Sequence, residues 1–297
     1  MEQEVFEWKE EYNIGVDKID NAHKELFALV NRIINNFMDR NFDKNKVTCM
    51  EAIKYLKSYT IKHFAEEEEY QLSINYPGYK THKKVHDNMR NVVIPALEKE
   101  VAIKSYSKES LEHFAGACAG WLAAHVLIED QAITGKTKSK WDINPDDDNE
   151  DTIDDIVKEY IRGLFRMTAN LVSKKYTGHK LGRLFCCNDV MSASDGTVYS
   201  VVTAVEESML EAVASRLINS TVYELDEVIL SMVSEMFRSF NLEVMMAFMR
   251  DSFTSLESRT MPNDEFYKIF ENKYPSYSML WRTEYGYMAL CISKKPQ

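Results

Sequence analysis

The sequence predicts two modules, an all-α four-helix bundle followed by an α+β domain. Apolar residues recur at helical spacing through the first part of the chain, and a polar, acidic stretch follows. Beyond it, β-branched runs alternate with helical segments. We therefore expect a bundle over residues 1–135, an acidic linker over 136–151 and an α+β domain over 152–297.

Composition excludes several classes of function. The 297 residues carry a formal net charge of −11, which argues against nucleic acid as a partner because phosphate binding needs a basic face. No signal peptide and no membrane-spanning run is recognisable, so we expect a cytoplasmic protein without a membrane partner. The cysteines are odd in number and lack paired metal spacing, which predicts buried or free thiols rather than disulfides: Cys49, Cys118, Cys186, Cys187 and Cys291.

Four helices are expected in the first module, preceded by an arm over residues 5–16 that packs on their core. They begin near residues 16, 46, 79 and 107, and the last ends before Gly135. Polar turns separate them at 41–43 and 75–79, and Ser107 is a candidate cap for the fourth. The apolar positions of the second helix predict these core residues: Ile53, Leu56, Ile61 and Phe64.

Residues able to bind a metal are distributed over all four helices. They are His23 on the first, His63 and Glu67 on the second, His82 and His86 on the third, and His125 and Asp130 on the fourth. The pairs on the second and third helices have a spacing of four residues, which places both members on one face. The interior of a helical bundle is where such inward side chains converge on a metal.

Taken singly, each of these residues has an ordinary structural explanation. A lone helical histidine is more commonly a surface or core residue, and Glu67 lies in the acidic run 66–69, which by itself indicates a solvated face. Five of the seven histidines nevertheless fit one pattern, and that joint arrangement indicates a metal site. His113 and His179 lie outside the pattern, and we expect them to be structural or exposed.

His125 and Asp130 are five residues apart. On an α-helix, with about 100° per residue, they lie about 140° apart, which is poor geometry for chelating one ion. We therefore expect His125 to bind one metal and Asp130 to reach across and bridge two.

The order of these ligands resembles bacteriohemerythrin over about residues 5–135. The matching stretches are Ile19-Asp20-x-x-His23, His63-Phe64-x-x-Glu67, Tyr76-Pro77-Gly78-Tyr79, His82-x-x-x-His86, Trp121-Leu122 and His125-x-x-x-x-Asp130. The interval between His23 and His63 is a few residues long for that family, and we place the extra residues in the turn at 40–46.

The resemblance implies a non-haem di-iron site that binds dioxygen. His82, His86 and His125 would hold one iron, and His23 and His63 the other. Glu67 and Asp130 would bridge the two irons together with an oxo or hydroxo group. Leu122 would lie over the dioxygen position and exclude water, although plain core packing explains it equally well. Five imidazoles against two carboxylates also favour reversible binding over oxygenation, since oxygen-activating di-iron sites are richer in carboxylates.

The linker is acidic, with most of its charge in 142–151. A single proline and many carboxylates predict an extended, solvated segment. A calcium loop is the alternative, but the stretch lacks the glycine and the terminal glutamate spacing of an EF-hand.

The C-terminal module is expected to begin with a helix over 152–173, followed by a short apolar run at 181–187. A strand over 197–205, helices over 206–219 and 225–248, and a hairpin around Tyr285-Gly286 complete it.

This half resembles the CheX-type chemotaxis phosphatase domain of the CheC/CheX/FliY class. The matching stretches are 205–210, 214–217, 224–227 and 282–288. That family carries a Glu-x-x-Asn motif, whose amide orients the attacking water. Here Glu235 is present, but Arg238 replaces the asparagine, and an arginine cannot accept a proton. Asn241 lies a turn late, and an exposed Glu235–Arg238 ion pair is the simpler interpretation, so we do not expect an enzyme.

Three hypotheses follow for the whole chain. The first is an oxygen or redox sensor that passes its state to a chemotaxis response regulator or another signalling partner. The second is a dioxygen or iron store whose C-terminal half only forms a homodimer. The third is a response-regulator phosphatase whose rate depends on the state of the iron.

Overall fold

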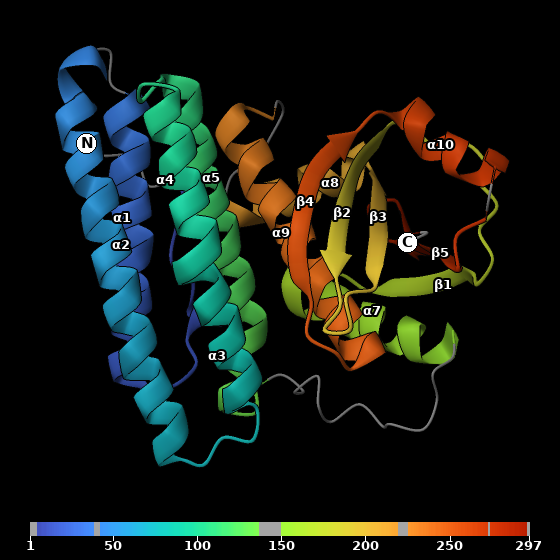
Figure 1. Ribbon diagram of the computed structural model, residues 1–297, viewed down its shortest axis with the longest axis horizontal. Coiled ribbons are helices and arrows are strands. Elements are labelled where there is room, and N and C mark those ends of the chain that lie inside the picture. Colours follow the sequence, from blue (N-terminus) through green and yellow to red (C-terminus); the bar gives the residue numbers. More distant parts are fainter. Residues whose placement is uncertain (1–4, 39–41, 137–149, 219–224, 273, 296–297) are drawn as a thin grey trace. The chain divides into compact units, whose positions relative to one another are not determined.

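The computed structural model describes residues 5–38, 42–136, 150–218, 225–272 and 274–295. They form two compact units, one helical and one built on a β-sheet (Figure 1). Most of the acidic linker, residues 137–149, lies outside the described part of the chain, as does the polar turn at residue 41. The domain boundaries that we expect at 135 and 151 border that stretch and remain predictions.

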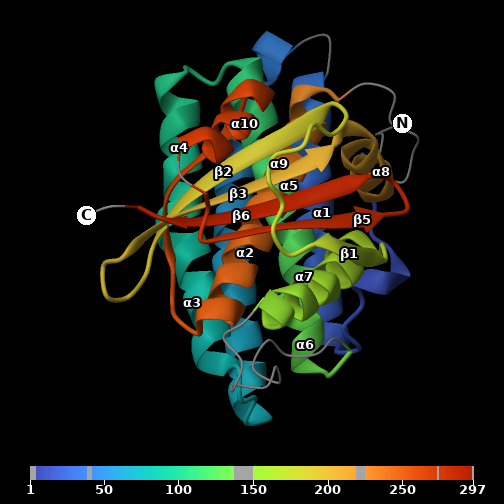
Figure 2. The ribbon, with the colours of Figure 1, turned by 90° about the vertical axis from the view of Figure 1, so that its right-hand side faces the viewer.

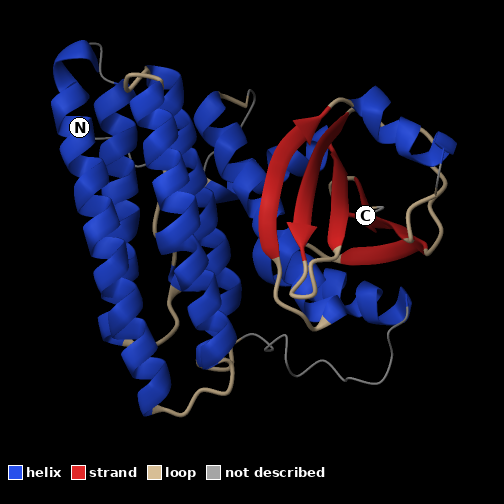
Figure 3. Ribbon diagram, viewed as in Figure 1, coloured by secondary structure: helices blue, strands red, loops and turns tan. Residues whose placement is uncertain are grey.

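The helical unit is the expected four-helix bundle (Figure 3). Two of its four rods are single helices, and each of the other two contains a π-helical turn. The elements are α1 (Asp17–Met38), α2 (Phe42–Ser73), α3 (Tyr79–Asn88), η2 (Met89–Val93), α4 (Ile94–Ile103), α5 (Lys108–His125), η3 (Val126–Asp130) and α6 (Gln131–Ile133). The π-turn η2 precedes Pro95, whose ring and missing N–H disrupt an ordinary α-helix.

The N-terminal arm packs on the bundle as expected. Phe6 and Tyr12 are buried, and Tyr12 closes a short 3₁₀ turn, η1 (Glu10–Tyr12). Asn31 on α1 holds the arm, because its Oδ1 accepts from the backbone N–H of Phe6 at 2.9 Å and its Nδ2 donates to the Phe6 carbonyl at 2.6 Å. The arm thereby covers one side of the bundle core.

Two details of α2 differ from the prediction. The helix begins at Phe42 rather than near residue 46, so the segment assigned to a turn is helical. Ile61 is 40% exposed rather than part of the core. Thr60 occupies the inward position instead, and its hydroxyl is satisfied by the Leu56 carbonyl at 2.8 Å. The expected cap is present at α5, where the Ser107 side chain accepts from the Ser110 N–H.

The helix Lys108–Ile133 is long and apolar enough to cross a membrane by length and composition alone, although no such segment was expected from the sequence. Within its most apolar window, 83% of the residues are buried inside the protein. That burial is what the central helix of a bundle requires.

The second unit is built on a six-stranded sheet of order β1-β5-β6-β3-β2-β4 (Figure 2), in which all neighbouring strands are antiparallel. It is an α+β fold. Its elements are α7 (Glu150–Phe165), β1 (Ala169–Ser173), β2 (Leu184–Ser192), β3 (Val198–Glu206), α8 (Glu207–Leu217), α9 (Glu227–Met249), β4 (Thr254–Met261), α10 (Asn263–Asn272), β5 (Tyr277–Thr283) and β6 (Tyr287–Lys294).

Helices pack on both faces of the sheet. On one face, Trp281 of β5 donates to Asp154 of α7 at 2.7 Å, and Asn241 of α9 donates to Asp189 of β2 at 2.6 Å. On the other face, Phe266 of α10 joins an apolar cluster with residues of β2, β3, β5 and β6. All five cysteines of the chain are free and buried, as predicted.

The predicted strand 197–205 and the closing hairpin are confirmed as β3 and as β5–β6. The helix expected over 152–173 is too long. It ends at Phe165, where Arg166 adopts a left-handed backbone with φ of 53°, and Ala169–Ser173 forms the edge strand β1. The strand β4 and the helix α10 were not predicted from the sequence.

Candidate metal centre

The seven predicted ligands meet in the interior of the bundle. Each is at most 4% exposed, and every rod of the bundle contributes at least one of them: His23, His63, Glu67, His82, His86, His125 and Asp130. Their ligand atoms form two groups that share Glu67. The larger group also contains three histidines and Asp130, and the smaller contains His23 and His63.

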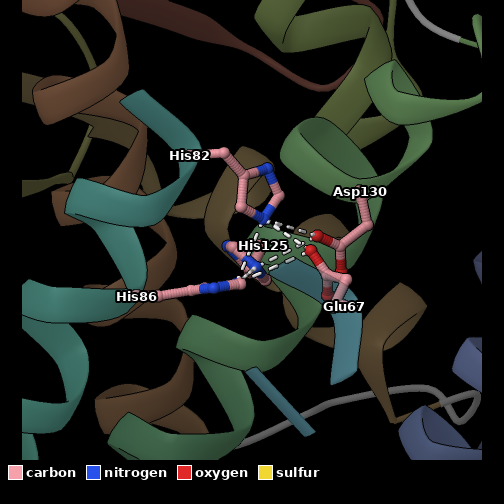
Figure 4. A group of neighbouring side chains, drawn as sticks. All are labelled: Glu67, His82, His86, His125 and Asp130. Carbon is pink, nitrogen blue, oxygen red and sulfur yellow. Dashed lines mark hydrogen bonds and ion pairs between the residues drawn. The ribbon is translucent and has the colours of Figure 1, made fainter. Parts of the chain in front are cut away.

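Three imidazole nitrogens converge in the larger group (Figure 4). The Nε2 of His86 lies 3.1 Å from the Nε2 of His82 and 3.0 Å from that of His125. Each nitrogen offers one position in its ring plane, for either a proton or a lone pair. The three therefore cannot all be satisfied by hydrogen bonds among themselves.

Glu67 divides its two oxygens between the groups. Its Oε1 lies 2.7 Å from the Nε2 of His82 and 3.7 Å from that of His86. Its Oε2 lies 3.3 Å from the Nε2 of His63 and 3.9 Å from that of His23. One carboxylate thus faces both histidine sets at once.

Asp130 is divided in the same way. Its Oδ1 lies 3.0 Å from the Nε2 of His125 and 3.3 Å from that of His82, whereas its Oδ2 lies 3.1 Å from the Nε2 of His23. Two buried carboxylates therefore span the same pair of histidine sets.

The local backbone corrects the geometric argument made for His125 and Asp130. The five residues from Val126 to Asp130 form the π-turn η3 rather than an α-helical turn. A π-turn closes over one more residue than an α-turn, which brings residues five apart onto one face. Asp130 consequently lies beside His125 as well as reaching toward His23.

The chemistry of this donor set fits a metal cation. Both Asp130 oxygens, Glu67 Oε2 and the Nε2 of His63 are buried and lack a well-directed hydrogen bond to the described residues. Buried polar atoms are normally paired, and a group of unpaired nitrogen and oxygen lone pairs aimed at common points is what a cation satisfies. Imidazole and carboxylate together suit iron and related transition metals.

Electrostatics keep the two carboxylates ionised. Burial opposes ionisation of Glu67, but the charges of His82 and His86 hold its pKa well below the usual range. Burial and the neighbouring Glu67 oppose ionisation of Asp130, yet the charge of His125 and the close contacts with the His125 and His23 rings lower its pKa to about 2. The carboxylates are therefore available as anionic ligands at neutral pH.

A further set of polar residues, not predicted from the sequence, touches the ligands. Glu68 accepts from the Nδ1 of His86 at 3.2 Å and pairs with Arg90, while Gln71 donates to Glu67 at 2.7 Å. Such contacts orient metal ligands and tune their donor strength. The signal for Gln71 was present in the sequence, since it continues the four-residue spacing of His63 and Glu67.

Aromatic rings cover the histidines. Trp121 stacks on His125 with ring centroids 4.4 Å apart, and Phe64 stacks on His86 at 4.0 Å. Trp8 of the N-terminal arm lies over His23 at 6.2 Å. These rings limit the access of water to the ligands.

Leu122 is 5% exposed and lines an apolar cavity inside the bundle. Trp121, Phe114 and Cys118 of the same helix line this cavity as well, together with Met89. An apolar cavity suits a small apolar molecule better than water. The dioxygen role expected for Leu122 remains a proposal.

The other two histidines lie away from the centre, since His113 and His179 are both exposed. In the sheet unit, Arg238 donates to Glu235 at 3.1 Å, so the degenerate motif forms an ion pair as expected, but the pair is partly buried rather than exposed. Asn241 is fully buried and donates to Asp189, and its own oxygen accepts from the Thr203 hydroxyl. Its amide is therefore committed to the protein interior.

The two halves of the chain differ in how similar they are to known proteins. For the C-terminal half, solved structures of low similarity are found. The chemotaxis protein CheX from Vibrio vulnificus matches 50% of this chain and 100% of its own, at 10% identity and a TM-score of 0.36. A chain of the CheX–CheY complex from Borrelia burgdorferi matches 48% of this chain and 96% of its own, at 12% identity and a TM-score of 0.35.

The bundle has clear relatives. Residues 14–136 match the family described as hemerythrin HHE cation binding domain. A bacteriohemerythrin from Clostridium acetobutylicum is 35% identical over 133 residues, which are 43% of this chain and 97% of that protein. One from Stenotrophomonas maltophilia is 28% identical over 141 residues, 44% of this chain and 81% of that protein. The chain therefore belongs to the hemerythrin family, and its bundle is a metal-binding domain of that family.

Proposed function

We propose that the bundle holds two iron ions and binds dioxygen reversibly. The observation that carries this proposal is the division of both buried carboxylates between two histidine sets. Glu67 and Asp130 each direct one oxygen toward the three-histidine side and the other toward the two-histidine side. A site for one metal would not need two carboxylates that each face two ways.

The two sides of the metal centre differ in their number of histidines, and we infer different roles for them. With one oxygen from each carboxylate, the set of His82, His86 and His125 offers five protein donors, whereas the set of His23 and His63 offers four. The side with fewer donors keeps room for an exogenous ligand. When bound, ferrous iron supplies the electrons that dioxygen binding requires.

The chain's own residues make that binding reversible by excluding water. Trp8, Phe64 and Trp121 cover the histidines, and Leu122 lines an apolar cavity that it shares with Trp121. Water and protons promote the loss of reactive ligands from such a site, and a dry, apolar enclosure opposes that loss.

The test is the visible spectrum of the iron-loaded protein, reduced under nitrogen and then exposed to air. We expect a charge-transfer band that develops in air and disappears when the dioxygen is removed. Irreversible bleaching, or no air-dependent band at all, would overturn the proposal.

For the whole chain, we propose that the state of the bundle is passed to a signalling partner of the chemotaxis type. What supports this part is the sequence resemblance of residues 152–295 to the CheX-type domain. A phosphorylated response regulator is the expected partner, in the cytoplasm, and the C-terminal half is the expected dimer contact. The test is the affinity of a phosphorylated response regulator for the reduced and the oxygenated forms of the protein. Equal affinities would contradict signalling and favour the storage hypothesis.

Phosphatase activity receives less support from the residues themselves. The Glu235 carboxylate is engaged by Arg238, and the Asn241 amide is buried against Asp189 and Thr203. Arg238 has no amide group, and the amide of Asn241 is not placed to orient an attacking water. We expect the decay of a phosphorylated regulator to be unaffected by the protein in either iron state, and acceleration would restore the enzymatic hypothesis.

A further inference from the structure

Gln71 continues the ligand face of α2. It follows His63 and Glu67 at intervals of four residues, so the three side chains form one stripe along the helix. They are 2%, 0% and 0% exposed, respectively. Gln71 is thus a fully buried amide placed directly beside a carboxylate that faces both histidine sets.

The hydrogen bond between Gln71 and Glu67 has a fixed direction. The Nε2 of Gln71 donates to the Oε1 of Glu67 at 2.7 Å, because an ionised carboxylate can only accept. The Oε1 of Gln71 has no hydrogen-bond partner among the described residues. An unpaired oxygen on a buried amide lowers the stability of the fold. The bond from the Nε2 of Gln71 to Glu67 therefore explains why a glutamine is found at this position.

The accepting oxygen identifies which side of the metal centre is affected. Glu67 Oε1 is the oxygen that faces the three-histidine set, at 2.7 Å from the Nε2 of His82. A hydrogen bond to a carboxylate oxygen withdraws electron density from it and fixes its orientation. Ferric iron prefers electron-rich oxygen donors more strongly than ferrous iron does, so weaker donation favours the reduced metal.

We propose that Gln71 is a positioning residue that holds Glu67 between the two histidine sets and biases bound iron toward the ferrous state. This inference rests on the proposed di-iron function. It adds to that function a specific role for the neutral Gln71 amide, which slows oxidation of the ferrous form in air.

A second buried glutamine supplies a matched control. Gln131 is 4% exposed and donates to the backbone carbonyl of Glu11 in the N-terminal arm. It therefore stabilises the fold through a hydrogen bond of its own without donating to a ligand carboxylate. Replacing each glutamine with methionine removes the donor while nearly conserving side-chain length and volume.

The experiment measures the midpoint potential of the full-length, iron-loaded protein in an electrochemical cell, for addition of one electron to each ferric ion. In Gln71→Met we expect the equilibrium to shift toward oxidised iron by about tenfold, or ~59 mV for a one-electron step. We also expect removal of ferrous iron by bipyridine to be about tenfold faster or more. Gln131→Met should leave the potential unchanged, because a purely structural glutamine affects stability and not iron chemistry.

Each outcome is interpretable. An unchanged potential in an iron-loaded Gln71→Met protein overturns the inference. A Gln71→Met or Gln71→Leu protein that folds without metal but no longer retains iron supports the positioning role, whereas two unfolded variants would show a purely structural residue and overturn it. If the unsubstituted protein itself takes up no iron, the proposed function fails first, which is a different result.

Discussion

Two buried polar clusters, one in the bundle and one in the sheet unit, show what distinguishes a ligand set from a largely hydrogen-bonded core. In the sheet unit, Thr203 donates to Asn241, and Asn241 donates to Asp189 at 2.6 Å, so hydrogens and lone pairs alternate. In the bundle, nitrogens and carboxylate oxygens face one another, and several of them lack a directed hydrogen bond. Burial is similar in both clusters. The sheet cluster leaves one carboxylate oxygen, Asp189 Oδ1, without a well-directed hydrogen bond among the described residues, whereas the bundle leaves several nitrogens and oxygens unpaired around common points. That larger mismatch of donors and acceptors indicates a cation site.

The largest effect is expected from removing one shared carboxylate. Glu67→Ala or Asp130→Ala should lower iron affinity by more than about 100-fold, because each side chain offers an oxygen to both histidine sets. Iron content per chain after gel filtration measures this. Glu69→Ala is the control, since Glu69 lies in the same acidic run but is exposed. Full iron content in both carboxylate variants would contradict the assignment.

A smaller effect on stability alone is expected in the sheet unit. Asn241→Ala removes the donor to Asp189 Oδ2 and leaves that buried oxygen unpaired, which should lower the free energy of unfolding by about 2–3 kcal/mol. Urea unfolding measures this loss, and iron content should stay unchanged. Asn188→Ala, which removes a partly buried hydrogen bond to Ser200 of the neighbouring strand, should cost less. A loss of iron in Asn241→Ala would break the distinction between the clusters.

The smallest effect concerns pH. Burial raises the pKa of Asp189 above its ordinary value of 3.8, although its bonds to Ser258 and Asn241 and the charge of Arg238 oppose this. The native state therefore binds this proton more tightly than the unfolded state, so the cost of the buried charge is present at neutral pH. It is relieved as the pH falls through the native pKa toward 3.8.

Asp189→Asn should remove that pH dependence while keeping an oxygen that accepts from Asn241. Compared with the unsubstituted protein, we expect it to be more stable at neutral pH, by a difference that shrinks toward pH 4. Urea unfolding of both proteins at a series of pH values measures this. A difference that grows on acidification would show that the sign is wrong.

The sequence predicted the bundle because strong helical periodicity coincided with ligands on every helix. Two features of the site were not predictable from an ideal helix. The π-turn Val126–Asp130 changes the direction of Asp130 relative to His125, and standard helical geometry cannot anticipate it. Gln71 continues the four-residue spacing of His63 and Glu67, but a glutamine is not a usual metal ligand, so its role depends on the contact with Glu67 that only the structure shows.

In the second half, long-range pairing limited the prediction. The strand Val198–Glu206 was recognisable from its β-branched residues, and the final hairpin from its glycine turn. The edge strand Ala169–Ser173 follows a helix after three residues and is fixed by pairing with β5, more than a hundred residues away. The strand Thr254–Met261 is mostly exposed, so its sequence lacks the apolar signal of a buried strand.

The most direct test of the account is a titration of the metal-free, full-length protein with ferrous iron under nitrogen, followed by iron-to-chain stoichiometry. The account predicts two irons per chain, and fewer in His63→Ala, which removes one of the two histidines on the side with fewer donors. One iron per chain in the unsubstituted protein, with His63→Ala unchanged, would show that the divided carboxylates do not bridge two metals and would contradict the central claim.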